Sequence, residues 1–168
     1  MCSDIPTDNV YYMTSFCDKS VACGAFSGNC NEWYMAGYKR FGCGSIVSCC
    51  QGSKCANLKV IDGGPGCSVE DKANKQIVDC SYSACKLFTG STSCGWSDKV
   101  KVTCKKTSKT LADSYEVVEG SPFNLQSAIG KVPLGPCSYN HKYALSLNLP
   151  ICGPDAHLFS ENELDFTE

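Results

Sequence analysis

The chain has 168 residues, enough for one domain with an appendage, and its formal net charge is −2. A mixed surface without a basic excess does not favour nucleic acid as a partner, and no run of 18 apolar residues predicts a membrane span. Fifteen cysteines form the strongest compositional signal. This density is typical of disulfide-bonded proteins from an oxidising compartment, so we expect a secreted, extracellular protein.

The cysteine spacing disfavours a metal site. No C-x-x-C pair occurs, and only two histidines are present, His141 and His157. Zinc sites usually combine closely spaced cysteine pairs with further cysteine or histidine ligands. We therefore predict disulfides, no metal and no cofactor. Because the cysteine count is odd, at least one thiol is unpaired within the chain.

Short strands separated by glycine-rich turns dominate the first hundred residues. One helix is predicted, with Ser81 as its N-cap and with Ala84, Leu87 and Phe88 on one apolar face. Many short strands with little helix indicate a small closed β-barrel, which leaves no exposed strand edges. The predicted strands are Val10–Thr14, Ser45–Cys50, Leu58–Asp62, Ile77–Asp79 and Val100–Cys104.

The composition changes near Lys106. Residues 1–107 carry 12 basic and 9 acidic side chains, whereas residues 108–168 carry 3 basic and 8 acidic ones. Thirteen cysteines lie in the first part and two, Cys137 and Cys152, in the second. We predict a disulfide-bonded barrel over 1–107 and a C-terminal acidic extension over 108–168 that packs on it. The extension contains a predicted strand, Lys142–Leu149, a predicted disulfide between its two cysteines, and a frayed end over 161–168.

Three segments occur in the order VIDGGPGC, IVDCSYSAC and GWSDKVKVTC, after an aromatic strand that contains Tyr11 and Tyr12. This arrangement resembles the double-psi β-barrel of expansins, barwin-like proteins and glycoside hydrolase family 45. The resemblance covers roughly residues 10–105. It implies an all-β fold, a six-stranded double-psi β-barrel with one or two short helices.

The resemblance also implies roles for two aspartates. Asp79 stands where the hydrolases have their general acid, and Asp62 stands where expansins have a second groove carboxylate. The hydrolases carry a catalytic base on the first strand, where this chain has Thr14. Since base assistance is worth about 10²–10⁴-fold in rate, hydrolysis is expected to be weak or absent. From the residues alone, Asp79 could equally be a turn or capping residue, and Asp62 a turn residue.

The candidate substrate-binding residues are mostly aromatic, because sugar rings stack on aromatic side chains. Core packing is the alternative for the two tryptophans. The candidates are Tyr12, Thr14, Trp33, Tyr82 and Trp96.

The favoured function is that of a secreted, monomeric, expansin-like protein that binds or loosens cell-wall polysaccharide: cellulose, chitin or peptidoglycan. One alternative is a protein-binding module, such as a protease inhibitor or defence protein, that uses the loop from Gly24 to Arg40. Another is an enzyme. It would be a single-acid glycan-cleaving enzyme, of the glycoside hydrolase or lytic transglycosylase type, or a cysteine-dependent acyl transferase. The acyl transferase would use the unpaired cysteine among the thirteen of the barrel, or Cys137 with His141 if Cys137 does not form the predicted disulfide.

Overall fold

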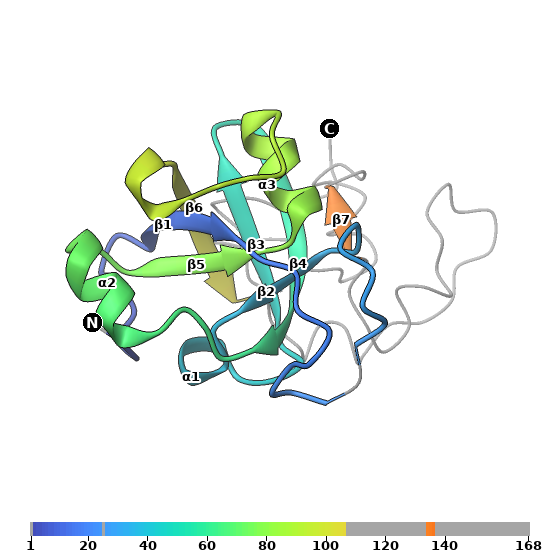
Figure 1. The fold of residues 1–168 in the computed structure, drawn as a ribbon. Coiled ribbons are helices and arrows are strands. Elements are labelled where there is room, and N and C mark those ends of the chain that lie inside the picture. Colours follow the sequence, from blue (N-terminus) through green and yellow to red (C-terminus); the bar gives the residue numbers. More distant parts are fainter. Residues whose placement is uncertain (1, 25, 107–133, 137–168) are drawn as a thin grey trace, which may run out of the picture.

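The computed structural model describes residues 2–24, 26–106 and 134–136 (Figure 1). Three α-helices and one 3-10 helix occur there: α1 (Tyr38–Phe41), α2 (Cys67–Ala73), α3 (Tyr82–Thr89) and η1 (Trp96–Asp98). The strands are β1 (Val10–Ser15), β2 (Tyr34–Ala36), β3 (Ile46–Gln51), β4 (Lys54–Asp62), β5 (Ile77–Cys80), β6 (Lys101–Lys106) and β7 (Gly135–Pro136).

Six strands close into a barrel. They are hydrogen-bonded in the order β2-β5-β1-β6-β3-β4, and pairing between β2 and β4 completes the circle. The β1–β5 and β2–β4 pairs are parallel and the other pairs are antiparallel. Figure 1 shows β1 beside β5, with α3 on one side of the barrel and α1 on the opposite side. The closed six-stranded fold confirms the prediction and fits the double-psi barrel superfamily.

The strand residues alternate between the barrel interior and its outer face. In β1, Tyr11 and Met13 are fully buried in the core cluster, whereas Tyr12 and Thr14 are partly exposed. This two-residue period is the pattern expected of a strand with one face on the core. The interior therefore fixes which β1 side chains reach the outer face.

The predicted helix after β5 is confirmed as α3. The Ser81 hydroxyl accepts a hydrogen bond from the Ala84 amide at 3.3 Å, as an N-cap does. Ala84 and Phe88 are buried and Leu87 packs against the core. The five strands predicted between residues 10 and 104 are also present, each with bounds that differ by a few residues.

The loop over residues 24–40 was predicted incorrectly, because it contains β2 and most of α1. The few short helices that were expected are present, as three α-helices in the described residues where one or two were expected. Three residues of β2 are too few to give a periodic hydrophobic signal. The helix α2 starts after Gly66, which offers no side-chain cap, so the sequence carries no start signal there.

Six disulfides join twelve of the thirteen described cysteines, and the remaining one, Cys80, is buried and unpaired. This confirms the prediction that at least one cysteine is unpaired, and the disulfides are consistent with an oxidising compartment. The pairs are Cys2–Cys67, Cys17–Cys30, Cys23–Cys43, Cys49–Cys104, Cys50–Cys55 and Cys85–Cys94.

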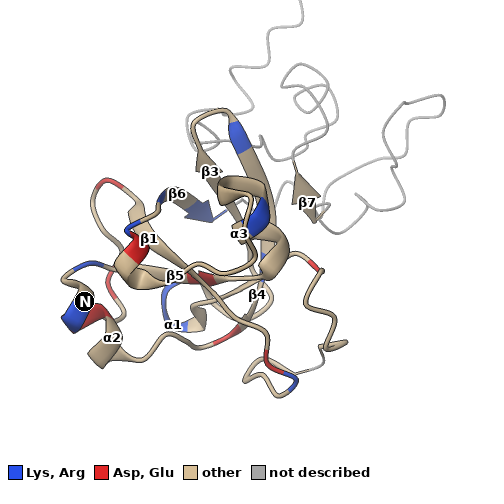
Figure 2. Cartoon of the chain, turned by 45° about the horizontal axis from the view of Figure 1, so that its top comes forward, with Lys and Arg blue, Asp and Glu red and all other residues tan. Residues whose placement is uncertain are grey.

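Several predictions concern residues outside the described ranges, namely the Cys137–Cys152 disulfide, His141, the strand over Lys142–Leu149 and the end over 161–168. Over the described residues, Figure 2 shows Lys/Arg and Asp/Glu positions interspersed, without a continuous basic stripe. None of the helices described there is long and apolar enough to cross a membrane.

Candidate functional site

Four neighbouring strands place Thr14, Asp79, Ala36 and Asp62 next to one another. Thr14 of β1 pairs with Asp79 of β5, and Ala36 of β2 pairs with Asp62 of β4. Between these pairs, β2 and β5 run antiparallel with Met35 opposite Cys80, so Ala36 stands beside Asp79. We call these four residues the outer row. They bring together both aspartates that the sequence identified.

A β-bulge brings Asp62 into the row. The β2–β4 register shifts between Met35 and Ala36, so Ile61 has no partner on β2 and Asp62 stands opposite Ala36. Bulges often re-aim a side chain near a functional site. Neighbouring strands lie about 4.8 Å apart, so the backbones of Asp79 and Asp62, two strands apart, are separated by roughly 9–10 Å.

Asp79 has the environment of a carboxylic acid that stays protonated in mildly acidic solution, up to a pH of about 6. Burial raises its pKa to about 6, the Thr14 hydrogen bond lowers it in part, and the negative charges of Asp18 and Asp62 raise it again. The Thr14 hydroxyl donates to Oδ1 at 2.7 Å. On the other side, a Cβ added to Gly64 would lie 3.7 Å from Oδ2. Gly64 therefore leaves Oδ2 without a side chain against it.

Asp62 has a different environment. Its Oδ1 accepts hydrogen bonds from the backbone amides of Ala22 at 3.1 Å and Gly63 at 2.8 Å. Its backbone carbonyl accepts a third bond from the Gly37 amide at 2.7 Å. The two bonds to Oδ1 hold the carboxylate in one orientation.

The candidate aromatic residues occupy different places. Tyr12 lies on the outer face of β1, one step from Thr14, and Tyr82 opens α3. Trp96, in η1, has 39% of its surface exposed. Trp33 packs against the core and against Gly135 of β7, where an added Cβ would lie 3.3 Å from its Nε1. Core packing thus accounts for Trp33.

Asp18 was not predicted from the sequence to belong to the site. Phe16 continues the β1–β5 ladder, because its amide donates to the Cys80 carbonyl at 2.9 Å, and Asp18 follows two residues later. The negative charge of Asp18 raises the pKa of Asp79. Its sequence signal is weak: it is simply a carboxylate four positions after Thr14, where the base of the hydrolases was sought.

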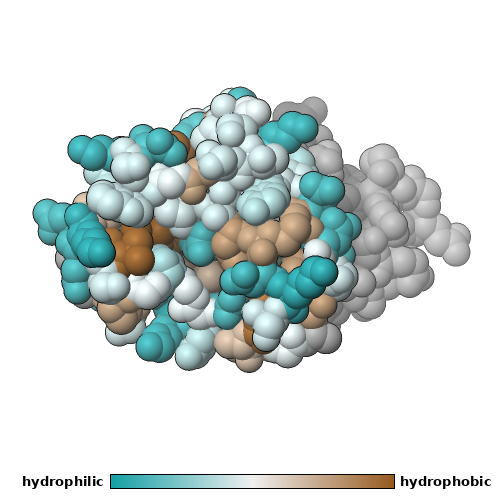
Figure 3. Space-filling model, in the orientation of Figure 1, coloured by the Kyte–Doolittle hydropathy of each residue, from teal (hydrophilic) through white to brown (hydrophobic). Residues whose placement is uncertain are grey.

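Tyr34, a further aromatic candidate from the sequence for which core packing was the alternative, opens β2 and is buried. Its hydroxyl donates to the Phe16 carbonyl at 2.8 Å, and its ring contacts Phe16 and Phe26 edge-on. Burial raises the pKa of Tyr34 to about 12, and the nearby Tyr82, Asp79 and Asp18 add to the shift. These groups therefore lie around one site. Figure 3, in the orientation of Figure 1, shows an apolar area near the middle of the visible surface, among hydrophilic surroundings.

The thiol and metal alternatives gain no support within the described part of the chain. Cys80 is fully buried in the core, and burial raises the pKa of its thiol well above the ordinary range. A nucleophilic cysteine needs a lowered pKa and access to substrate. No cluster of three metal-ligating side chains occurs among the residues that the structure describes.

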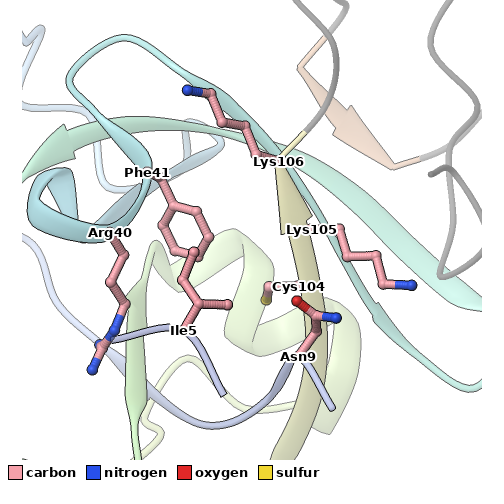
Figure 4. A pocket seen from close by; sticks show the side chains of 7 residues that line it. All are labelled: Ile5, Asn9, Arg40, Phe41, Cys104, Lys105 and Lys106. Atoms are coloured by element: carbon pink, nitrogen blue, oxygen red, sulfur yellow. The ribbon is translucent and has the colours of Figure 1, made fainter. Parts of the chain in front are cut away.

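A cavity of about 260 Å³ lies at the other end of β1, lined by residues that include Asn9, Phe41 and Lys106 (Figure 4). Figure 4 shows Ile5 and Phe41 facing its centre, whereas the amino groups of Lys105 and Lys106 point away from it. Asn9 precedes β1, and Thr14 lies near its end. The cavity is therefore separate from the outer row.

Comparison with known proteins points to lysozymes. The AlyA family model, described as "Lysozyme A", matches residues 1–143. Lysozyme C of Dictyostelium discoideum is 42% identical over 126 residues, covering 74% of this chain and 67% of its own length. Lysozyme B of the same organism is 40% identical over the same shares of the two chains. No solved structure matches. These comparisons do not support the expansin, barwin or family 45 assignment.

Proposed function

The chain belongs to the AlyA lysozyme family, and on that premise we propose that it is a lysozyme that cleaves peptidoglycan, with Asp79 as the general acid. The relatives favour the glycan-cleaving alternative over the non-hydrolytic binding and loosening that the sequence analysis preferred. The observation that carries the assignment is the half-buried carboxyl of Asp79, with its pKa raised to about 6. Glycosidases need such an acid to protonate the leaving oxygen.

The two oxygens of Asp79 have different tasks in this proposal. Oδ1 accepts the hydrogen bond from Thr14, so the acidic proton resides on Oδ2. Oδ2 faces Gly64, where the missing side chain leaves room for the glycosidic oxygen. As the bond to the leaving sugar breaks, Oδ2 gives its proton to that oxygen, and Thr14 stabilises the resulting carboxylate.

We assign the general base to Asp62. Inverting glycosidases hold their two carboxyl groups roughly 6.5–9.5 Å apart so that a water fits between the base and the sugar. The backbones of Asp62 and Asp79 stand two strands apart across Ala36, roughly 9–10 Å, which supports a placement of the two carboxyl groups with a water between them. Both hydrogen bonds from Ala22 and Gly63 go to Oδ1, so Oδ2 is the oxygen that would take a proton from water. The resemblance had given Asp62 only a role in the groove.

The test compares purified variants on insoluble peptidoglycan. Asp79→Asn is expected to lower the rate of glycan release at least 100-fold while still binding the polymer. Asp71→Asn, at an exposed position of α2, is the matched control and keeps full activity. Unchanged turnover in Asp79→Asn would refute the assignment of the acid.

The products test the assignment of the base. Hydrolysis adds one water and leaves a reducing end, whereas attack by the sugar's own hydroxyl leaves an anhydro product without a reducing end. With Asp62 as base, mass spectrometry should show hydrated products, and Asp62→Asn should slow their formation at least 100-fold. Anhydro products with an active Asp62→Asn variant would instead indicate the single-acid, transglycosylase type.

A further inference from the structure

Tyr38 is an exposed aromatic residue that adjoins the outer row. It opens α1, and 38% of its surface is accessible. The preceding residue, Gly37, donates its amide to the Asp62 carbonyl at 2.7 Å, so α1 begins directly beside Asp62. Tyr38 was not among the substrate-binding residues predicted from the sequence, and the chain has Gly63 and Gly64 directly after Asp62.

The Tyr38 ring occupies the space that a side chain at Gly63 would need. A Cβ added there would overlap Cε1 of the ring and lie 2.7 Å from Cδ1. Gly63 is not among the residues with positive φ, so its backbone does not itself require glycine. The Tyr38 ring, rather than the turn, therefore accounts for glycine at position 63.

Two consecutive glycines, Gly63 and Gly64, lie between the Tyr38 ring and the Asp79 carboxyl group. The edge of Tyr38 lies against Gly63, and Oδ2 of Asp79 faces Gly64. Consecutive Cα atoms are only about 3.8 Å apart. A sugar whose glycosidic oxygen reaches Asp79 would therefore have a neighbouring ring within reach of Tyr38.

We propose that Tyr38 forms a sugar-binding platform next to the acid–base pair, on which one pyranose ring of the glycan stacks. The inference rests on the proposed function and adds a residue that determines substrate affinity. One face of a pyranose presents mainly C–H groups, which favour contact with an aromatic ring. Contact with Gly63 holds the Tyr38 ring in place, so little conformational entropy is lost when a sugar binds.

Binding is measured in the inactive Asp79→Asn background, so that turnover does not obscure it. Adding Tyr38→Ala should weaken retention on insoluble peptidoglycan about tenfold, as expected for loss of one aromatic contact. Tyr38→Trp should retain binding. Lys39→Ala, at the next exposed position of α1, is the matched control and should not change it.

Gly63→Ala displaces the ring without removing it. This variant should weaken binding to a similar degree. The double variant Tyr38→Ala with Gly63→Ala should bind no worse than Tyr38→Ala alone, because both changes remove the same contact between the Tyr38 ring and the sugar. Circular dichroism and thermal unfolding check that each variant folds. A fully additive double variant would show that Gly63 acts independently of Tyr38 and would overturn the proposal.

The outcomes separate the two proposals. Normal binding by Tyr38→Ala, together with inactivity of Asp79→Asn, would refute the platform and leave the lysozyme assignment intact. Full turnover of peptidoglycan by Asp79→Asn would refute the assignment of the acid whatever Tyr38 does. Tenfold weaker binding by Tyr38→Ala, with an unchanged Lys39→Ala control, supports the platform.

Discussion

Asp79 sits between two opposing influences on its pKa, which makes the pH dependence of activity a direct test of its role. Burial raises the pKa to about 6, and the Thr14 hydrogen bond holds it below the value that burial alone would give. A general acid must be protonated to act. Activity is therefore expected to fall as the pH rises through about 6.

The variant Thr14→Val removes the hydroxyl while keeping the side-chain volume. Since the lost hydrogen bond favoured the ionised carboxylate, the pKa of Asp79 should rise. The alkaline fall in kcat/KM should then move to higher pH, whereas loss of fold would lower activity equally at every pH. A pH profile of initial rates measures the shift. An unchanged or acid-shifted profile would contradict the proposed protonation state of Asp79.

Cys80 is adjacent to Asp79 in sequence but points into the core, and this difference predicts an inert thiol. The side chain is fully buried and burial raises its pKa. Iodoacetamide should leave Cys80 unlabelled in the native protein and modify it after unfolding, as peptide mapping by mass spectrometry would show. Cys80→Ala should keep activity. Native labelling accompanied by loss of turnover would instead favour thiol chemistry.

At the scale of secondary-structure elements, a buried ion pair connects α1, α2 and β5. Arg40 donates to both carboxylate oxygens of Glu70, and the Ile77 amide donates to Oε1 at 2.9 Å. The two side chains are only 4% and 1% exposed. The Glu70 carboxylate therefore bonds to both α1 and β5, and it holds α1 and α2 in place around the start of β5.

Removing one partner should therefore be costly. Glu70→Ala removes the buried carboxylate that Arg40 contacts and leaves the exposed Asp4 carboxylate, 3.8 Å away, as its counter-charge. Breaking a buried ion pair typically costs about 3–5 kcal/mol. Urea unfolding with the disulfides intact measures the loss, and the exposed neighbour Asp71→Ala is the control, expected within about 0.5 kcal/mol of the unchanged protein. Equal stability of the two variants would show that the ion pair contributes little.

The sequence predicted those elements that carry a complete local signal. β1 alternates through Tyr11 and Met13, and α3 has both a serine cap and an apolar face, so both were predicted nearly in full. β2 has three buried residues without alternation, and α2 lacks a cap. Their positions depend on partners distant in the sequence, which a window of a few residues does not contain.

For the whole molecule, contacts between residues distant in sequence also explain why the arrangement of the site was not predicted. Asp62 and Asp79 were identified because each follows an apolar run. Their placement in one row, however, depends on Ala36 of the unpredicted β2 and on the bulge at Ile61. The approach of Tyr38 to Gly63 comes from packing between α1 and the end of β4. Such contacts arise from barrel closure and leave no trace in local sequence patterns.

The barrel also predicts how much of the chain is needed to fold. All six described disulfides and all six barrel strands lie within residues 2–106, whereas β7 is the one strand described beyond that range. We propose that the folding unit ends near residue 107. A chain that stops after Lys106 should therefore form the same six disulfides and keep the far-ultraviolet circular dichroism of a β-barrel.

The shortened chain loses one contact that can be followed directly. Gly135 lies against Trp33, so its removal should expose that indole and shift the tryptophan fluorescence to longer wavelength. The other tryptophan, Trp96, is already 39% exposed and should contribute little to the shift. Trp33→Phe in the full chain is the control, because it removes the responsive indole and keeps the contact apolar. If the shortened chain scrambles its disulfides instead, the C-terminal residues belong to the folding unit, because the closed barrel alone would then be insufficient to select the native pairs.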